Sequence, residues 1–470
     1  MSVPQRIAPP AESLREFYVG KDVHSVPKPA AVLDAAKVRR HCQSMLDAVD
    51  ALGVGFRAHV KTHKTEEIAR LQAGEKHRQA NFVVSTVAEM EHLMPVFQDY
   101  KRTGRGVNVL YGVPLLGSQV GRLAALGEQL GRDGLAVMVD HPAQLESVER
   151  LRDLTGFPAG VFVKVDTGYH RAGLPPAALN KGGLLERLVR LEADGRAAFV
   201  GVYSHSSLSY RDTTADQAMR NLAAEIEGCS EALRANAGLL LTRGPREVVV
   251  SVGATPQVTA VENLTAAAAA GAATAAAAGG PGERRLREAI AGAETGALEG
   301  GLRSSLELHA GVYSVLDMQQ MSTGSRTGLG GYEDEVAVTV AAEVCSVYND
   351  GEREAPEALV AVGTLGLGRE PCPSYGGWGV SGRLPFPGSD EGRRLVVERI
   401  SQEHSVLSWD SGPEKAAELP PIPLEVGQTV SIYPNHACVT GALYGWYLVV
   451  DSSGPDETEI VDVWVRGSGW

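Results

Sequence analysis

The chain has 470 residues and a formal net charge of −13, and its basic residues are scattered, so nucleic acid and anionic membranes are poor candidate partners. This length predicts two domains, or one barrel with an appendage. No apolar run approaches the roughly 20 residues of a membrane-spanning helix, and the N-terminus lacks the regions of a signal peptide, so we expect a cytoplasmic protein that does not bind membranes.

Residues 1–29 are predicted to be an N-terminal extension. From residue 30 to about 260, short β-rich runs alternate with longer segments of helical apolar spacing. The predicted strands span residues 54–62, 80–86, 106–113, 135–140, 160–166, 198–205 and 246–253. Apolar strands joined by helices form parallel sheets, and seven or eight such units favour a closed α/β barrel of the TIM type.

The composition changes at residues 265–301, which are almost entirely Ala, Gly and small polar residues. We expect this segment to be a low-complexity surface insertion with little that could pack a core. The run "LELHAGVYSVLDMQQM" (306–321) has the pattern of the last barrel strand and its return, so the barrel is predicted to span residues 30–330.

From about residue 334 onward the pattern changes to strand–turn–strand. The predicted strands span residues 335–348, 358–367, 403–409, 427–434, 446–451 and 459–467. Residues 331–470 are therefore predicted to form a mainly antiparallel β domain.

Polar side chains gather at the carboxyl ends of the predicted barrel strands, which is where barrel enzymes work. His59, Lys61 and His63 follow the first of these strands, in "RAHVKTHKT". Arg171 follows a later strand in "KVDTGYHRAGL", and Tyr203 ends another in "VYSHSSLSY". Each residue alone is typical of an ordinary loop or core, but their common position favours an active site.

The turn "SVGATP" (251–256) is the candidate for binding phosphate. A turn of small residues after an apolar strand exposes backbone N–H groups, and Gly253 allows an oxyanion to approach closely. A lysine at a barrel mouth can form a Schiff base with an aldehyde. Pyridoxal phosphate (PLP) is the cofactor that needs both groups.

A candidate metal site lies near the C-terminus, in "PNHACVT" (434–440). If this segment is extended, His436 and Cys438 point to the same side, and imidazole with thiolate favours zinc over magnesium or manganese. Two ligands are too few for a closed structural site, which leaves positions for water or substrate. On spacing alone, a buried cysteine beside an ordinary histidine is the commoner arrangement.

Together, "RAHVKTHKT", "KVDTGYHRAGL", "VYSHSSLSY", "SVGATP", "ELHAGVY" and "PNHACVT" resemble the eukaryotic-type D-serine dehydratases. These are relatives of D-threonine aldolase within the alanine-racemase-like fold group of PLP enzymes. The resemblance covers nearly the whole chain and implies a homodimer whose subunits complete each other's active sites. It also implies roles for individual residues: Lys61 as the Schiff-base lysine; His59, Arg171, Tyr203, Tyr210, Ser251, Gly253 and Thr255 as cofactor contacts; and His436 and Cys438 as zinc ligands.

The implied reaction is the PLP- and zinc-dependent conversion of D-serine to pyruvate and ammonia. Lys61 would remove the α-proton, and zinc would make the β-hydroxyl a better leaving group. One alternative is retro-aldol cleavage of D-3-hydroxy amino acids to glycine and an aldehyde. Another is a PLP-binding protein without catalytic activity, although such a protein has no need of a metal pair.

Overall fold

The computed structural model describes residues 10–269, 280–295, 297–382, 393–411 and 419–470. The chain divides into two compact units. The barrel unit contains residues 42–313, 323–328 and 469–470, and the β unit contains residues 1–41, 314–322 and 329–468.

Eight parallel strands close the sheet of the barrel unit, because β10 pairs with both β8 and β2. They are β2 (Gly55–His59), β3 (Gln79–Val84), β4 (Gly106–Pro114), β5 (Leu135–Val139), β6 (Gly160–Lys164), β7 (Ala198–Tyr203), β8 (Arg246–Val252) and β10 (Leu302–Ala310). The short strand β9 (Ala297–Glu299) pairs with β10. Each barrel strand overlaps a run predicted to be a strand, so the predicted TIM-type barrel is confirmed.

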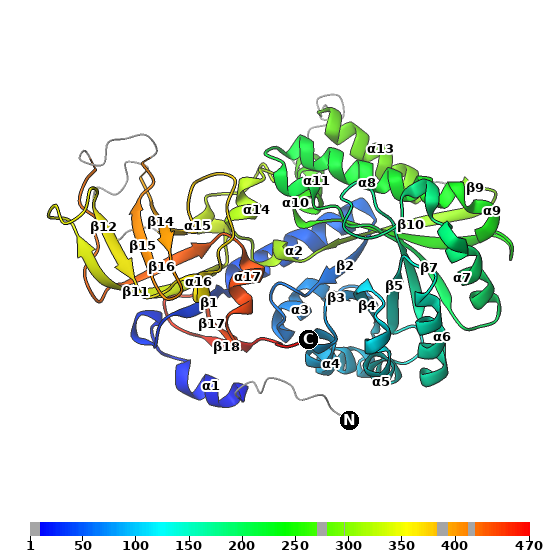
Figure 1. Cartoon of the computed structure of the whole chain (residues 1–470), viewed down its shortest axis with the longest axis horizontal. Coiled ribbons are helices and arrows are strands. Elements are labelled where there is room, and N and C mark those ends of the chain that lie inside the picture. The colour runs from blue at the N-terminus through cyan, green and yellow to red at the C-terminus, as the bar shows by residue number, and fades with distance from the viewer. Residues whose placement is uncertain (1–9, 270–279, 296, 383–392, 412–418) are drawn as a thin grey trace. The chain divides into compact units, whose positions relative to one another are not determined.

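Helices alternate with these strands and surround them (Figure 1). They are α3 (Glu66–Ala73), α4 (Val87–Arg102), α5 (Val120–Leu130), α6 (Gln144–Thr155), α7 (Leu184–Ala193) and α8 (Ala215–Ala235), with the C-terminal part of α2 (Ala35–Leu52). Shorter elements are α9 (Ala237–Leu240), α10 (Thr255–Thr259), α11 (Val261–Ala269), η2 (Gly117–Gln119), η3 (Pro176–Ala178), η4 (Lys181–Gly183), η5 (Leu208–Arg211) and η6 (Val312–Ser314). The hydroxyls of Thr65, Thr86 and Thr214 cap α3, α4 and α8 by accepting backbone N–H bonds.

The interior of the barrel is filled by side chains. Strands β5 and β6 are buried at every residue, as expected for strands covered on both faces. One buried cluster joins Val83, Leu110, Ala136, Met138, Phe162 and Tyr203. The barrel is therefore a packed core, and chemistry is left to its carboxyl end.

Six strands of the β unit close a second, antiparallel barrel in the order β11, β12, β15, β14, β13, β16. They are β11 (Val338–Tyr348), β12 (Glu357–Val360), β13 (Gly379–Ser381), β14 (Leu395–Ile400), β15 (Ser405–Trp409) and β16 (Thr429–Pro434). The sheet continues from β11 through β1 (Ala30–Asp34), β17 (Trp446–Val450) and β18 (Asp462–Val465). The helices are α1 (Ala11–Tyr18), η1 (Val23–Ser25), α14 (Met318–Ser322), α15 (Tyr332–Glu335), α16 (Thr364–Leu367) and α17 (Ala437–Ala442). The predicted, mainly antiparallel β domain is confirmed.

The N-terminal boundary predicted for the barrel, residue 30, is wrong. Strand β1 lies in the sheet of the β unit, where it pairs antiparallel with β11 and parallel with β17. Ahead of it, α1 packs near β18, and Arg15 Nε donates to Asp462 Oδ1 at 2.6 Å. The predicted extension, residues 1–29, thus contributes to the β unit from residue 10 onward, and residues 1–9 lie outside the described part.

The expectation that residues 265–301 pack no core is also wrong for part of the segment. Residues 281–295 form α13 (Pro281–Thr295), which lies against α8 (Figure 1). Leu286, Ile290 and Ala293 are buried in this contact, because their spacing of three and four residues places them on one helix face. Residues 270–279 and 296 of the predicted insertion lie outside the described residues.

Leu286→Ala is therefore expected to destabilise the protein by about 2–5 kcal/mol, because it removes a fully buried side chain and leaves a cavity. Urea unfolding would measure the change. The control is Glu288→Ala on the exposed side of α13, which should change stability by no more than about 0.5 kcal/mol. Equal stability of Leu286→Ala and wild type would contradict the packing of α13.

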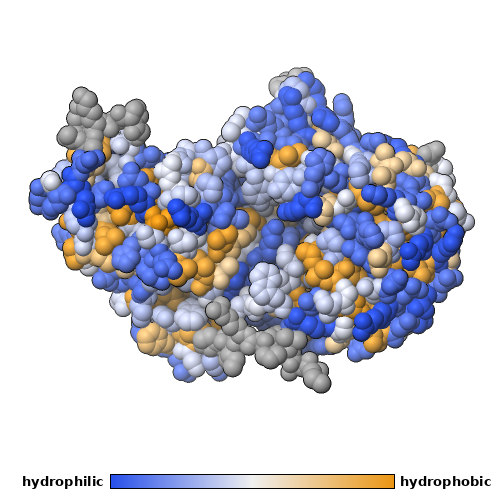
Figure 2. All heavy atoms as spheres, viewed as in Figure 1, coloured by the Kyte–Doolittle hydropathy of each residue, from blue (hydrophilic) through white to orange (hydrophobic). Residues whose placement is uncertain are grey.

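The surface is mainly polar on the face that Figure 2 shows. Hydrophilic residues cover most of this face, and hydrophobic residues form smaller patches between them. Within the described ranges, no helix is long and apolar enough to cross a membrane.

Candidate active site

A cavity of about 340 Å³ opens at the carboxyl ends of the barrel strands. Its lining comes from β4, β7, the ends of β2 and β6, and the loops that follow β2, β3, β6 and β7. The lining residues are His59, Lys61, Ser85, Gly112, Val113, Pro114, Lys164, Arg171, Ala172, Tyr203 and His205. Four residues singled out in the sequence, His59, Lys61, Arg171 and Tyr203, therefore meet in one cavity.

Lys61 occupies the turn between β2 and α3. Its backbone N–H donates to Nδ1 of His59 at 3.4 Å, and His59 is 8% exposed. The next lysine, Lys64, has a different partner, since its Nζ lies 3.0 Å from Oε1 of the buried Glu89. Of these two lysines, Lys61 is thus the one that faces the cavity.

Arg171 lies at the rim of the cavity, in the loop after β6. Its side chain is exposed, and its guanidinium lies 5.4 Å from the centre of the Tyr169 ring. Backbone contacts hold this loop: Gly173 N–H donates to Asp140 Oδ2 at 3.0 Å, and Leu174 N–H donates to the Lys164 carbonyl at 3.0 Å. The arginine can therefore reach a ligand from a fixed loop.

Tyr203 forms part of the cavity wall and stacks on His309 of β10. The two rings are nearly parallel, at 7°, with centroids 4.1 Å apart. Tyr210 lies on η5 and is half-buried, outside the lining of the cavity. Its predicted contact with the cofactor stays a prediction.

The turn after β8 is shaped by close packing against β10. Gly253 has φ of 146°, and a Cβ there would lie 2.4 Å from the carbonyl oxygen of His309, so only glycine fits. The Ser251 hydroxyl donates to Glu307 Oε1 at 2.9 Å and lies 3.1 Å from His309 Nδ1. Ser251, Gly253 and Thr255 are buried but are not among the lining residues, so their phosphate-binding roles stay predictions.

The charges in the cavity are mainly positive. Burial and the nearby cations of Lys61, Lys164 and Arg171 lower the pKa values of the surrounding imidazoles well below their usual range. These imidazoles belong to His59, His205 and His309, which are therefore neutral at pH 7. Neutral imidazoles beside three cations make the cavity suitable for anions.

The residues present fit a cofactor that carries an aldehyde and a phosphate. Lys61 supplies an amine at the cavity, and its surroundings favour negatively charged ligands. In addition, Nε2 of His309 is buried without a hydrogen-bond partner among the residues that the structure describes. Buried polar atoms without partners are rare, and they are found at functional sites.

Sequence reasoning missed Lys164 and Glu225. Lys164 is the last residue of β6 and lies within the quoted run "KVDTGYHRAGL", but it ends an apolar strand and gives no motif signal. Glu225 lies in the middle of α8, and only its spacing to the apolar residues of the helix could have indicated that it is buried.

The candidate metal pair in the β unit has a different local structure from the one predicted. Residues 437–442 form α17, and His436 is the residue before its first turn, so the segment is not an extended strand. His436 and Cys438 nevertheless interact through a hydrogen bond, because the helix start brings the two side chains together. Asp317 Oδ2 accepts the Ala437 N–H at 2.8 Å and so fixes this helix start.

The surroundings of His436 favour a cation. Its Nδ1 is buried, has no hydrogen-bond partner in the described part of the chain, and lies 4.0 Å from Glu370 Oε2. Burial opposes protonation, but the hydrogen bond with Cys438 and the nearby carboxylates raise the pKa of His436 to about 9. Nitrogen and sulfur donors in this setting fit zinc. Across the described ranges, no group of three or more His, Cys, Asp or Glu side chains is placed to hold a metal.

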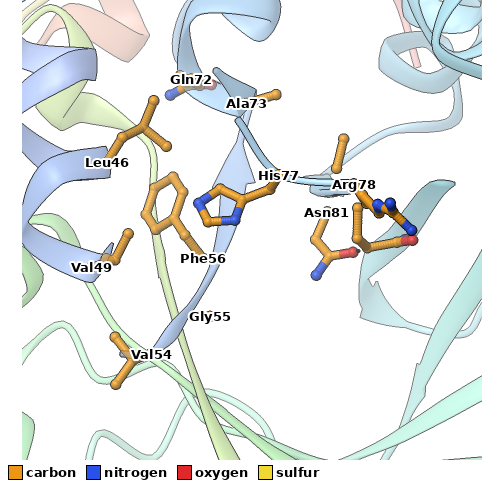
Figure 3. A pocket seen from close by; sticks show the side chains of 12 residues that line it. Leu46, Val49, Val54, Gly55, Phe56, Gln72, Ala73, His77, Arg78 and Asn81 are labelled. Atoms are coloured by element: carbon orange, nitrogen blue, oxygen red, sulfur yellow. Dashed lines mark hydrogen bonds between the residues drawn. The ribbon is translucent and has the colours of Figure 1, made fainter. Parts of the chain in front are cut away.

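A second cavity, of about 330 Å³, lies at the opposite, amino ends of β2 and β3. Figure 3 shows the rings of Phe56 and His77 side by side, with Leu46 and Val49 from α2 to one side. His77 is exposed and pairs with Asp50 at 2.7 Å. The amino end of a barrel serves stability, so the cavity around Lys61 is the candidate active site.

Comparisons with known proteins find relatives of both parts of the chain. Residues 33–274 match the family model of the alanine racemase N-terminal domain, and residues 337–450 match that of the putative serine dehydratase domain. The D-serine dehydratase of Schizosaccharomyces pombe is 32% identical over 467 residues, which cover 98% of this chain and 96% of that protein.

Two further matches concern a second activity. The D-threo-3-hydroxyaspartate dehydratase of Delftia sp. (strain HT23) is 27% identical over 457 residues, 94% of this chain and 97% of that protein. A solved structure of D-threo-3-hydroxyaspartate dehydratase, a cysteine-to-alanine mutant in the metal-free form, superimposes with a TM-score of 0.68. It is 24% identical, covers 96% of this chain and 100% of that chain, and shows the common fold.

Proposed function

The chain belongs to the D-serine dehydratase family, and on that premise we propose that it converts D-serine to pyruvate and ammonia. The observation that carries the proposal is the near-full-length similarity to the fission-yeast D-serine dehydratase, which is 32% identical over 98% of this chain. The family is one of lyases. Because the relative acts on D-serine, the proposed substrate is a small D-amino acid.

The proposed cofactor is pyridoxal phosphate, held through Lys61. When bound, PLP supplies an electron sink for the bond at Cα of an amino acid. Lys61 would hold the cofactor in the resting enzyme and, once released, take the α-proton of the substrate. Tyr203 and its stacked partner His309 form a rigid wall, and Arg171 supplies a cation at the rim.

The proposed metal is zinc, held by His436 and Cys438. When bound, it would act as a Lewis acid that assists departure of the β-hydroxyl. The donor set supports zinc, because thiolate and imidazole together select it over harder cations. The metal-free form of the solved cysteine-to-alanine mutant supports a metal in this group of enzymes.

The proposed protein is cytoplasmic, and the family resemblance implies that it is a homodimer. One alternative substrate is D-threo-3-hydroxyaspartate, because the bacterial dehydratase for that compound matches the chain over nearly its full length. Retro-aldol cleavage of D-3-hydroxy amino acids, as in D-threonine aldolase, is the alternative reaction. The match to dehydratases outside the barrel, over residues 337–450, argues against a PLP-binding protein without activity.

The test is to incubate the purified protein, with PLP and zinc, with D-serine, L-serine, D-threonine and D-threo-3-hydroxyaspartate. We expect pyruvate from D-serine and none from L-serine. Oxaloacetate formed faster from hydroxyaspartate than pyruvate from D-serine would transfer the assignment to the alternative substrate. Glycine as the main product from D-threonine would favour the aldolase reaction.

A further inference from the structure

The cavity contains a second lysine that the proposed reaction does not use. Lys164 is the last residue of β6, across the barrel from the strand that precedes Lys61. It lines the cavity and is 5% exposed. Its Nζ lies 5.0 Å from the centre of the Tyr203 ring.

The ammonium of Lys164 lacks an anionic partner in direct contact. In the part of the chain that the structure describes, it donates no hydrogen bond and forms no ion pair. A buried ammonium without such partners is costly, and it is retained where a ligand supplies them. The burial of Lys164 lowers its pKa to about 8.

The carboxylate that interacts most strongly with the charge of Lys164 already accepts hydrogen bonds from other side chains. Glu225 of α8 is buried and accepts hydrogen bonds from Ser204 Oγ at 2.8 Å and from Gln257 Nε2. Its charge favours the charged form of Lys164, although the two groups make no ion-pair contact. Glu225 thus balances part of the charge and leaves the donors of Lys164 available to the cavity.

We propose that Lys164 binds an anionic oxygen of the ligand in this cavity. The inference rests on the proposed function, which supplies two sources of such oxygens: the carboxylate of the amino-acid substrate and the oxygens of the phosphorylated cofactor. When the Lys61 amine holds the cofactor, Lys164 and the rim residue Arg171 are the lysine and arginine side chains left in the lining. Of these two, Lys164 is the buried one, where a charge-assisted hydrogen bond is strongest.

The test compares wild type with Lys164→Met, using D-serine and ethanolamine, which has the same amine and hydroxyl but no carboxylate. Binding is followed by the absorbance change of the bound cofactor, and the PLP dissociation constant is measured by titration. These readouts do not depend on turnover, so they stay informative if D-serine is not the true substrate. The control is Lys181→Met on η4, an exposed lysine of the same unit.

If Lys164 binds the substrate carboxylate, Lys164→Met should weaken D-serine about ten- to a hundred-fold and leave ethanolamine and PLP within about two-fold of wild type. If Lys164 binds the cofactor, the dissociation constant of PLP should rise by a similar factor, and the binding of D-serine and of ethanolamine should change to the same extent. Unchanged binding of D-serine, ethanolamine and PLP in a folded Lys164→Met protein would overturn the proposal.

Lys164→Met leaves Glu225 without its balancing charge, so a folding defect could obscure the result. The double variant Lys164→Met/Glu225→Gln removes both charges and keeps the shapes of the side chains. A purely structural role for Lys164 predicts that the double variant recovers wild-type melting temperature and wild-type binding of D-serine and PLP together. Our proposal predicts recovered melting temperature with binding still weakened.

Discussion

Replacing Lys61 with alanine is expected to abolish both pyruvate formation and the borohydride-reducible link between protein and PLP. The lost amine has two proposed roles, attachment of the cofactor and removal of the α-proton. Loss of proton transfer alone costs about 10²–10⁴-fold in rate. The measurements are pyruvate release, cofactor absorbance, and peptide mass after borohydride reduction.

The matched control is Lys64→Met, three residues along the same turn. Lys64 is engaged with Glu89 at 3.0 Å and does not line the cavity, so this variant should keep the link and most of the activity. A reducible cofactor link retained in Lys61→Ala, or lost in Lys64→Met, would show that Lys61 is not the attachment point.

Removing the metal is expected to stop pyruvate release while the absorbance of the protein-bound cofactor stays unchanged. The reason is that the proposed metal assists loss of the hydroxyl, whereas the cofactor is attached in the barrel unit through Lys61. Chelator treatment and His436→Ala should give the same result, and added zinc should restore activity only to the chelated wild type. Zinc content by atomic emission would accompany each assay.

A change of ligand hardness should shift the metal preference. Cys438→Asp replaces sulfur by oxygen, so zinc should bind more weakly and manganese or magnesium relatively better. We expect a gain in cleavage of D-threonine to glycine relative to dehydration of D-serine. Full dehydratase activity in a metal-free His436→Ala protein would remove the metal from the reaction and leave Cys438 as a buried thiol.

The barrel could be predicted because its signal is local. Strands such as β5 and β6 are apolar at nearly every residue, and the helices between them have helical apolar spacing. Residues 30–34 were not predicted to be a strand and fell within the range 30–330 assigned to the barrel, because the apolar run and the helix after it resemble one more barrel unit. The strands with which β1 actually pairs, β11 and β17, lie far along the chain, and a local pattern holds no information on such pairing.

Helix α13 was missed because its apolar face is small. Leu286 and Ile290 are its only large buried side chains among the described residues, and the Ala- and Gly-rich flanks obscured their spacing. What makes the segment structural is the complementary face of α8, which packs against it. That face belongs to another element, so the composition of residues 265–301 could not reveal it.

The candidate site was predicted in its chemistry better than in its geometry. Lys61 was singled out because it lies between two histidines at a strand-to-helix junction, and His436 and Cys438 because their residue types bind metals. The helix start that brings His436 and Cys438 together depends on Asp317. This residue lies 120 positions from Ala437 and accepts its N–H. Lys164 was missed because a lysine that ends an apolar strand looks like an ordinary strand terminus.

The sharing of one sheet by both ends of the chain affects how the protein can be made. The strands of the TIM-type barrel are complete once residue 310 has been synthesised, whereas β1 must wait for β17. Asp34 and its partner Ser452 are 418 positions apart, so the ribosome, at roughly 5–20 residues per second, needs about 20–80 s to supply the second after the first. Until β11 is synthesised, β1 has no strand to pair with, and its second edge stays open until β17 follows; unpaired strand edges are a known source of aggregation. Slower elongation over the last 140 or so codons should therefore lower the yield of folded protein more than the same delay within the barrel.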